Sequence, residues 1–139
     1  MIFFHRKKQQ TAQPVRWRIT RSCLNMILEM GKSSMPNEFG ALLKVRPGDK
    51  HTIAEIALLP GTIAGTSHAL FQLHMLPVDY SIVGTVHSHP SGDALPSEDD
   101  MFLFSRYGRI HVIVASPFTE DSWNVFDYTG KTIDVELVA

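Results

Sequence analysis

Several features that mark particular classes of protein are scarce or absent in this sequence. It contains a single cysteine, Cys23, and therefore cannot form an internal disulfide. It has no apolar run long enough to span a membrane, and its opening residues, MIFFHRKK, place the basic cluster after the apolar pair, the reverse of a secretory signal. We therefore expect a cytoplasmic protein. Cys23 is expected to be a small buried residue of an amphipathic helix.

The sequence also lacks an excess of charge of one sign. Thirteen basic and fourteen acidic side chains leave a formal net charge of −1. This balance gives no electrostatic basis for binding nucleic acid or an anionic membrane. No internal repeat, low-complexity segment or interior linker divides the 139 residues. We expect one domain over residues 15–139, preceded by a flexible tail over residues 1–14.

The spacing of apolar residues predicts a sheet with helices packed against it. Thr20 is expected to cap a helix that ends near Lys32, and Ser97 to cap a helix over residues 98–106 that Gly108 ends. The segment over residues 77–80 is expected to be a short helix or turn. Strands are predicted over residues 38–45, 51–60, 66–73, 81–89, 109–117, 123–129 and 131–138. The first two strands should form a hairpin, and the turn TGK should join the last two, in an α/β or α+β fold.

The segment TVHSHPSGDALPSEDD, residues 85–100, carries the clearest chemical signal. Side chains two apart in a strand point to the same side, so His87 and His89 present both imidazoles to one point while Ser88 faces away. The loop that follows can bring Asp100 back toward the end of the strand. Two imidazoles and one carboxylate, with a fourth position left to water, are the ligand pattern of a catalytic zinc site.

Each part of this pattern also has an ordinary structural explanation. Ser97-x-x-Asp100 is a helix-capping pattern, and a lone histidine near a strand end is usually a hydrogen-bonded surface or boundary residue. The remaining histidines are interpreted in that way: His5, His51, His68, His74 and His111. The joint spacing His-x-His-Pro-x6-Ser-x2-Asp favours the metal site, because five fixed residues rarely fall into one arrangement by chance.

A hydrolytic zinc site also needs a carboxylate base beside the metal, and the sequence offers six glutamates. Glu38 differs from the others because it begins an otherwise apolar strand, EFGALLKV. An acid near the edge of a core is costly without a partner. Its ordinary explanation is a surface acid at the end of a strand.

Together these residues resemble the JAMM motif of the MPN-type zinc metalloproteases. The resemblance is carried by Glu38, by His87-Ser88-His89-Pro90, and by Ser97 and Asp100. The likeness covers roughly residues 19–128, and the sequence is similar to the compact prokaryotic, archaeal form, which lacks the long insertions of specialised deubiquitinating enzymes. The resemblance implies a single-domain, three-layer, cytidine-deaminase-like MPN fold, with a central mixed sheet flanked by helices.

The resemblance also implies a function. His87, His89 and Asp100 would bind one zinc ion, Glu38 would be the general base and proton shuttle, and the Ser97 hydroxyl would steady the oxyanion. The chain would then be a zinc isopeptidase or peptidase that cuts after the C-terminal glycines of a ubiquitin-like or sulfur-carrier protein, through Glu38-assisted attack of zinc-bound water. A small ubiquitin-like partner is favoured over ubiquitin itself.

Two other functions remain consistent with the sequence. A non-catalytic MPN scaffold is one, although the complete motif argues against it. A zinc hydrolase acting on a small amide is the other, since the motif specifies water activation and not the leaving group. The tail of a modifier would bind as an added strand at an exposed edge, for which residues 66–75 are a candidate. A homodimer through the FF pair or through Met26 and Met30 is a further expectation.

Overall fold

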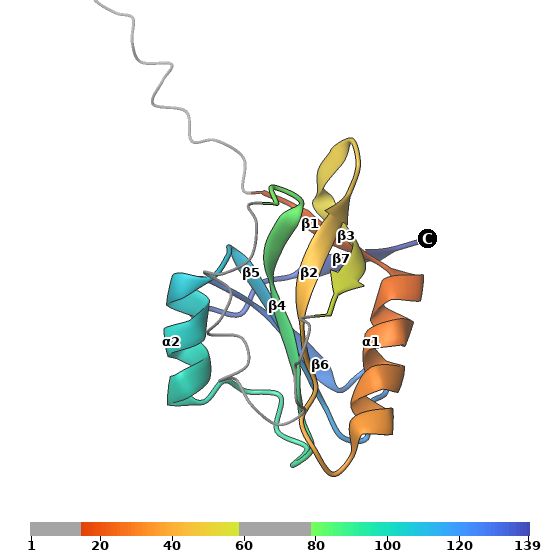
Figure 1. Ribbon diagram of the computed structural model, residues 1–139, viewed down its shortest axis with the longest axis vertical. Coiled ribbons are helices and arrows are strands. Elements are labelled where there is room, and N and C mark those ends of the chain that lie inside the picture. The colour runs from red at the N-terminus through yellow and green to blue at the C-terminus, as the bar shows by residue number, and fades with distance from the viewer. Residues whose placement is uncertain (1–14, 59–78) are drawn as a thin grey trace, which may run out of the picture.

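The computed structural model describes residues 15–58 and 79–139, which form a central sheet with a helix on each face (Figure 1). The elements in chain order are β1 Trp17–Thr20, α1 Arg21–Ser34, β2 Gly40–Arg46, β3 Asp49–Ala57, β4 Ile82–His89, α2 Glu98–Arg106, β5 Ile110–Ala115, β6 Trp123–Asp127 and β7 Val135–Val138. The following predictions lie outside the described residues: the tail over residues 1–14, the strand over 66–73, the candidate edge over 66–75, and the first half, residues 77–78, of the turn over 77–80.

The sheet is mixed, as predicted, and the described part of the chain contributes seven strands to it, in the order β6-β5-β4-β2-β3-β1-β7. β4 and β5 are parallel, β1 is parallel to both β3 and β7, and the other neighbours are antiparallel. The antiparallel pairing of β2 with β3 confirms the predicted hairpin, whereas β1 was not predicted. β4 and β5 approach so closely that a Cβ at Gly84 would lie 1.5 Å from the Ile110 carbonyl oxygen, so only glycine fits there.

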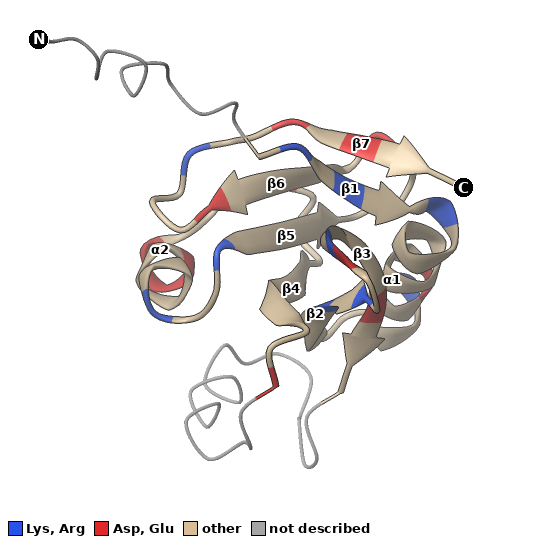
Figure 2. Ribbon diagram, turned by 90° about the horizontal axis from the view of Figure 1, so that it is seen from above, with Lys and Arg blue, Asp and Glu red and all other residues tan. Residues whose placement is uncertain are grey.

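The two edges of the sheet approach each other (Figure 2). Side chains of both edge strands join one apolar cluster, and the Ile133 amide donates to the Val125 carbonyl over 2.9 Å. The single strand predicted over residues 131–138 is therefore wrong in extent. Thr132 forms a bridge to β6, and only Val135–Val138 form β7, which pairs with β1 at the other end of the strand order.

The two faces of the sheet bury different residues because neighbours along a strand alternate between them. Val86, Val112 and Val114 pack in the cluster that α1 covers, whereas Ile113 packs with Phe104 of α2. The buried residues of α1 are those that the helical spacing predicts, together with Gly31: Cys23, Leu24, Ile27 and Leu28. The histidine-bearing strand β4 therefore turns one side to α1 and the other to α2.

Thr20 begins α1 as predicted. Its backbone is extended, and its Oγ1 accepts a hydrogen bond from the Cys23 amide over 3.1 Å. This bond satisfies one of the amide groups that the first turn of a helix leaves without a main-chain partner. The helix ends at Ser34, slightly beyond the predicted end at Lys32.

The thiol of Cys23 is expected to react slowly in the folded protein. Its side chain is buried, and burial, with a smaller contribution from the charge of Glu55, raises the pKa of the thiol to about 11. At pH 8 the thiol is therefore protonated, and only the thiolate is a nucleophile. We expect alkylation by iodoacetamide, followed by mass spectrometry, to be at least about 100-fold slower in the native protein than in urea. Equal rates in both conditions would contradict the buried position.

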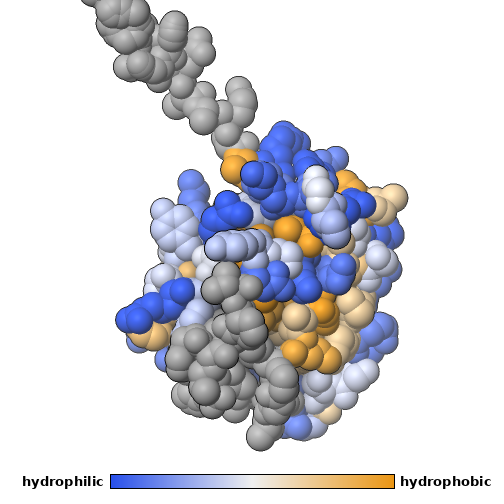
Figure 3. Space-filling view, turned by 45° about the horizontal axis from the view of Figure 1, so that its top comes forward, coloured by the Kyte–Doolittle hydropathy of each residue, from blue (hydrophilic) through white to orange (hydrophobic). Residues whose placement is uncertain are grey.

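The surface of the described residues carries charges of both signs on many elements, with an acidic first turn on α2 (Figure 2). Figure 3 shows hydrophilic residues over one end of the molecule and a group of hydrophobic residues beside them. Neither of the helices in residues 15–58 and 79–139 is long and apolar enough to cross a membrane.

Candidate metal centre

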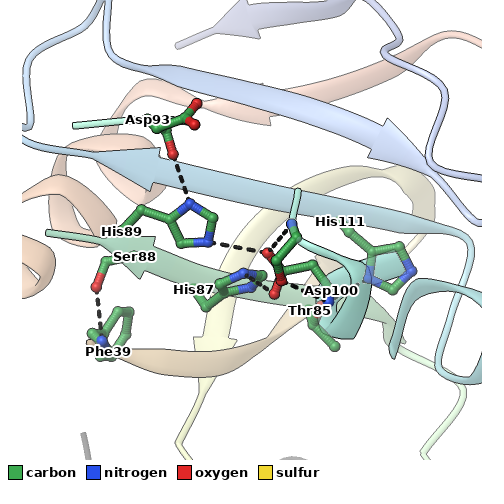
Figure 4. Close-up of polar contacts among 9 residues, drawn as sticks. Phe39, Thr85, His87, Ser88, His89, Asp93, Asp100 and His111 are labelled. Atoms are coloured by element: carbon green, nitrogen blue, oxygen red, sulfur yellow. Dashed lines mark hydrogen bonds and ion pairs between the residues drawn. The ribbon is translucent and has the colours of Figure 1, made fainter. Parts of the chain in front are cut away.

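His87 and His89 lie at the end of β4, on the face that α2 covers (Figure 4). Their ring centroids are 5.0 Å apart. His87 is 4% exposed and His89 is half-buried, whereas Ser88 points to the opposite face and is fully buried. Because β4 pairs with β2 on one side and β5 on the other, its backbone holds both imidazoles in place. The predicted alternation along this strand is confirmed.

Asp100 reaches the same point from the first turn of α2. Its Oδ1 lies 2.8 Å from Nε2 of His87, and its Oδ2 lies 3.1 Å from Nε2 of His89. The same carboxylate accepts from the Ser97 amide over 2.9 Å, while Oγ of Ser97 accepts from the Asp100 amide over 3.1 Å. These reciprocal bonds form a capping box. The two explanations of this acid are therefore both correct: Asp100 supports the helix start and also faces the histidines.

The donor atoms of these three residues fit a metal ion. One ligand atom from each of His87, His89 and Asp100 lies within 4.8 Å of the other two. Within residues 15–58 and 79–139, the buried Nδ1 of His87 has no hydrogen-bond partner, and its Nε2 has only the Asp100 carboxylate, 2.8 Å away, beside it. A buried polar atom without a partner is costly, and a cation at the point where the three groups meet would satisfy it. Two nitrogens and one oxygen are ligands that zinc accepts.

One ring nitrogen of His89 already has a hydrogen-bond partner in the protein. Its Nδ1 lies 2.6 Å from the carbonyl oxygen of Asp93, in the loop between β4 and α2. Since a carbonyl can only accept, this nitrogen donates, and the lone pair of the neutral ring is left on Nε2, which faces Asp100. Histidines that bind metals are commonly oriented by such a bond. The loop SGDALP therefore orients one ligand in addition to bringing Asp100 back.

The electrostatics of the site favour positive charge. Burial tends to raise the pKa of the Asp100 carboxyl, but the adjoining imidazoles of His87 and His89 and the Ser97 amide outweigh burial and hold that pKa well below its ordinary value. The contact with Asp100 raises the pKa of His89 against the effect of burial, with further contributions from the Asp93 carbonyl and the charge of Glu38. A proton and a metal ion therefore compete for the same imidazole.

Glu38 lies two residues before β2, not at its first residue, and is half-buried. Gly40 pairs with His87, so continuing the antiparallel register places Glu38 opposite His89. Continuing the alternation of side chains from β2 would put Glu38 on the face of the two histidines, and its charge acts on His89. Ser97 is exposed at the N-cap of α2. The structure therefore brings all five predicted site residues to one end of β4.

His111 was predicted to be a surface or boundary residue, and this is wrong. It is fully buried on the α2 face of β5, directly beside Thr85, whose Oγ1 lies 2.7 Å from its Nδ1. Its ring stacks on Phe104 of α2 with centroids 4.3 Å apart. Burial lowers the pKa of His111 to about 4, so its ring is neutral at pH 7. The available signal was the unbroken apolar run around it, IHVIVA, which is typical of a strand buried on both faces.

The chain resembles known proteins over most of its length. The model of a family described as prokaryotic homologs of the JAB domain matches residues 20–126. A probable metalloprotease from Haloferax volcanii is 31% identical over 127 residues, which cover 86% of this chain and 78% of that protein.

Solved structures give the same result. A JAB1/MPN domain protein from Archaeoglobus fulgidus is 38% identical with a TM-score of 0.70, over 88% of this chain and 99% of that chain. A structure described as JAMM, a metalloprotease-like zinc site in the proteasome and signalosome, is 36% identical with a TM-score of 0.69, over 90% and 100% of the two chains. A protein from Desulfitobacterium hafniense, 18% identical with a TM-score of 0.58 over 86% and 91%, shares the fold. The predicted MPN fold is confirmed.

Proposed function

This chain belongs to the family of prokaryotic homologs of the JAB domain, and we propose that it is a zinc-dependent isopeptidase or peptidase. Its substrate would be the bond after the C-terminal glycines of a ubiquitin-like or sulfur-carrier protein. The observation that carries the proposal is the convergence of His87, His89 and Asp100 within 4.8 Å, beside a carboxylate, Glu38, whose charge acts on His89. The relative described as a probable metalloprotease supports the same class of reaction.

His87, His89 and Asp100 would hold the zinc ion through two imidazole nitrogens and one carboxylate oxygen. Zinc bound by three protein ligands acts as a Lewis acid and lowers the pKa of water in its open position to about 7. The protein orients these groups: β4 aligns the imidazoles, the Asp93 carbonyl fixes the ring of His89, and the capping box fixes Asp100. Such partners of the ligands keep a site in the geometry that the metal requires.

Glu38 would move the proton. Its carboxylate would face the ligands, opposite His89 in the continued register, and it does not belong to the three-residue group. A base in that position can take a proton from the attacking water and pass it to the leaving amine. The leaving group would therefore depart as a neutral amine, and the carboxylate would be restored.

Ser97 would bind the carbonyl oxygen of the scissile bond. Its Oγ accepts from the Asp100 amide, which fixes the oxygen while leaving the hydroxyl hydrogen available for donation. Its side chain is exposed at the start of α2, on the loop that also carries His89's partner Asp93. A donor placed where negative charge develops lowers the barrier, and removal of one such donor costs about 100- to 1,000-fold in rate.

The substrate class is tested with a fusion that joins a small ubiquitin-like domain to a reporter through a Gly-Gly tail. We expect the zinc-loaded protein to release the reporter after the second glycine, as measured by mass spectrometry. A fusion in which both glycines are replaced by valine should be cut far more slowly, because the proposed substrate is defined by its Gly-Gly tail. Equal cleavage of both fusions and of small amides would favour a general zinc hydrolase, and cleavage of none would favour a scaffold.

A further inference from the structure

Ser88, between the two histidines, has a buried hydroxyl with a specific partner. Ser88 is fully buried on the α1 face of β4, where Val86 and Phe39 belong to the large apolar cluster. A buried hydroxyl in such surroundings needs a hydrogen bond. Its Oγ accepts from the Phe39 amide over 2.7 Å, and its own amide donates to the Phe39 carbonyl over 2.9 Å. The two bonds tie one residue of β4 to one residue that precedes β2.

This pair lies just beyond the regular ladder. The regular pairing of β2 with β4 begins at Gly40 and His87, so Phe39 and Ser88 would be the next rung. In a regular antiparallel rung the Phe39 amide would donate to the Ser88 carbonyl, but here the hydroxyl takes that place. The Phe39 side chain, 7% exposed, provides a second anchor in the core. The Ser88 hydroxyl therefore extends the hydrogen bonding between β4 and the chain before β2 by one residue.

The residue held in this way adjoins Glu38. Residues 35–39 form a turn and an irregular segment between α1 and β2, without the ladder that would otherwise fix a side chain. With Phe39 directed into the α1 cluster, a continued strand alternation would turn Glu38 to the opposite face, where the two histidines lie. The hydroxyl bond to Ser88 is thus one of the contacts that fix the backbone next to the Glu38 carboxylate.

We propose that Ser88 is a positioning residue for the reaction: its hydroxyl fixes the Phe39 amide and thereby holds Glu38 at the distance needed for proton transfer. The inference rests on the proposed function. In this assignment His87 and His89 are metal ligands on one face of the sheet, and Ser88, on the other face, positions the backbone next to the base Glu38. Ser88 itself would touch neither metal nor substrate.

Ser88→Ala in the zinc-loaded protein tests this role. We expect kcat on the Gly-Gly fusion to fall roughly 10- to 100-fold, as for other groups that orient catalytic residues, with little change in KM or in zinc per chain. The Phe39 amide should exchange its hydrogen faster, as measured by NMR. In a Glu38→Gln background the same substitution should cause no further loss, because the base it positions is gone. Ser88→Thr, which keeps the hydroxyl, should restore activity.

Thr52→Val is the matched control, because Thr52 is also fully buried on a strand and its hydroxyl bonds to Arg18 and Asp49. It should leave kcat unchanged. If Ser88→Ala does not fold, Ser88→Cys has a similar volume and only a weak acceptor, and it replaces the alanine variant. Wild-type kcat in the Ser88 variant, or an equal loss in both backgrounds, would overturn the inference while leaving the proposed function intact. A zinc-loaded wild type that cleaves nothing would overturn both.

Discussion

Glu38→Gln is expected to slow cleavage of the Gly-Gly fusion strongly while leaving the zinc content at the wild-type level. The carboxamide has almost the shape of the carboxylate but cannot accept the proton, and loss of a general base typically costs roughly 100- to 10,000-fold in rate. Glu38 is not one of the three converging ligands, so the metal should be retained. The measurement is kcat/KM on the fusion, together with zinc per chain by elemental analysis.

Glu29→Gln provides the control for this result. Glu29 is a glutamate on the solvent side of α1, where it forms an exposed ion pair with Lys32, and its substitution should leave both cleavage and zinc unchanged. The role of Glu38 would be contradicted by a Glu38→Gln variant that cleaves at the wild-type rate. A variant that loses zinc as well as activity would instead make Glu38 part of the metal site.

Asp100→Asn is expected to release the zinc while preserving the helix. Asparagine keeps an oxygen that can accept from the Ser97 amide, so α2 retains its cap, but the anionic ligand is lost. His89→Ala removes a second ligand atom. Both changes should weaken zinc binding by more than about 100-fold, beyond the effect of losing a group that only orients a ligand. Zinc affinity is measured by competition with a chelating dye.

Asp100 is both a metal ligand and part of the helix cap, and a variant that removes the cap but keeps the ligand separates these two roles. Ser97→Ala should keep the zinc but lose the cap, with a cost of about 0.5–2 kcal/mol in unfolding free energy and reduced cleavage. His51→Ala, which removes a half-buried histidine on β3 that contacts Trp17, should leave zinc affinity unchanged. Wild-type affinity in Asp100→Asn and His89→Ala would show that residues 85–100 form only a strand end and a helix cap.

Local periodicity was enough to predict most of what positions this site. A two-residue spacing fixes the face of His87 and His89 in any strand, and a capping pattern places Asp100 in the first turn of α2. Both hold here because they depend on neighbours in the chain. The helix over residues 98–106 has the predicted bounds for the same reason.

What the sequence could not predict depends on contacts between distant segments. The strand order that places His111 beneath α2 depends on the parallel pairing of β4 with β5, which no local pattern encodes. The separation of β7 from β6 depends on its pairing with β1, a strand that was itself missed. Ser88 was correctly expected to face away from the histidines, but its partner, Phe39, is forty-nine positions away in the chain. The role proposed for Ser88 could therefore be inferred only from the folded structure.

The zinc content per chain of the wild-type protein tests most directly whether residues 85–100 form a metal centre. The protein would be purified without chelators, exposed to excess zinc, freed of unbound ion, and measured by elemental analysis. We expect about one zinc per chain, lost on dialysis against a chelator and regained on addition of zinc. A wild type that holds no zinc after such treatment would contradict it.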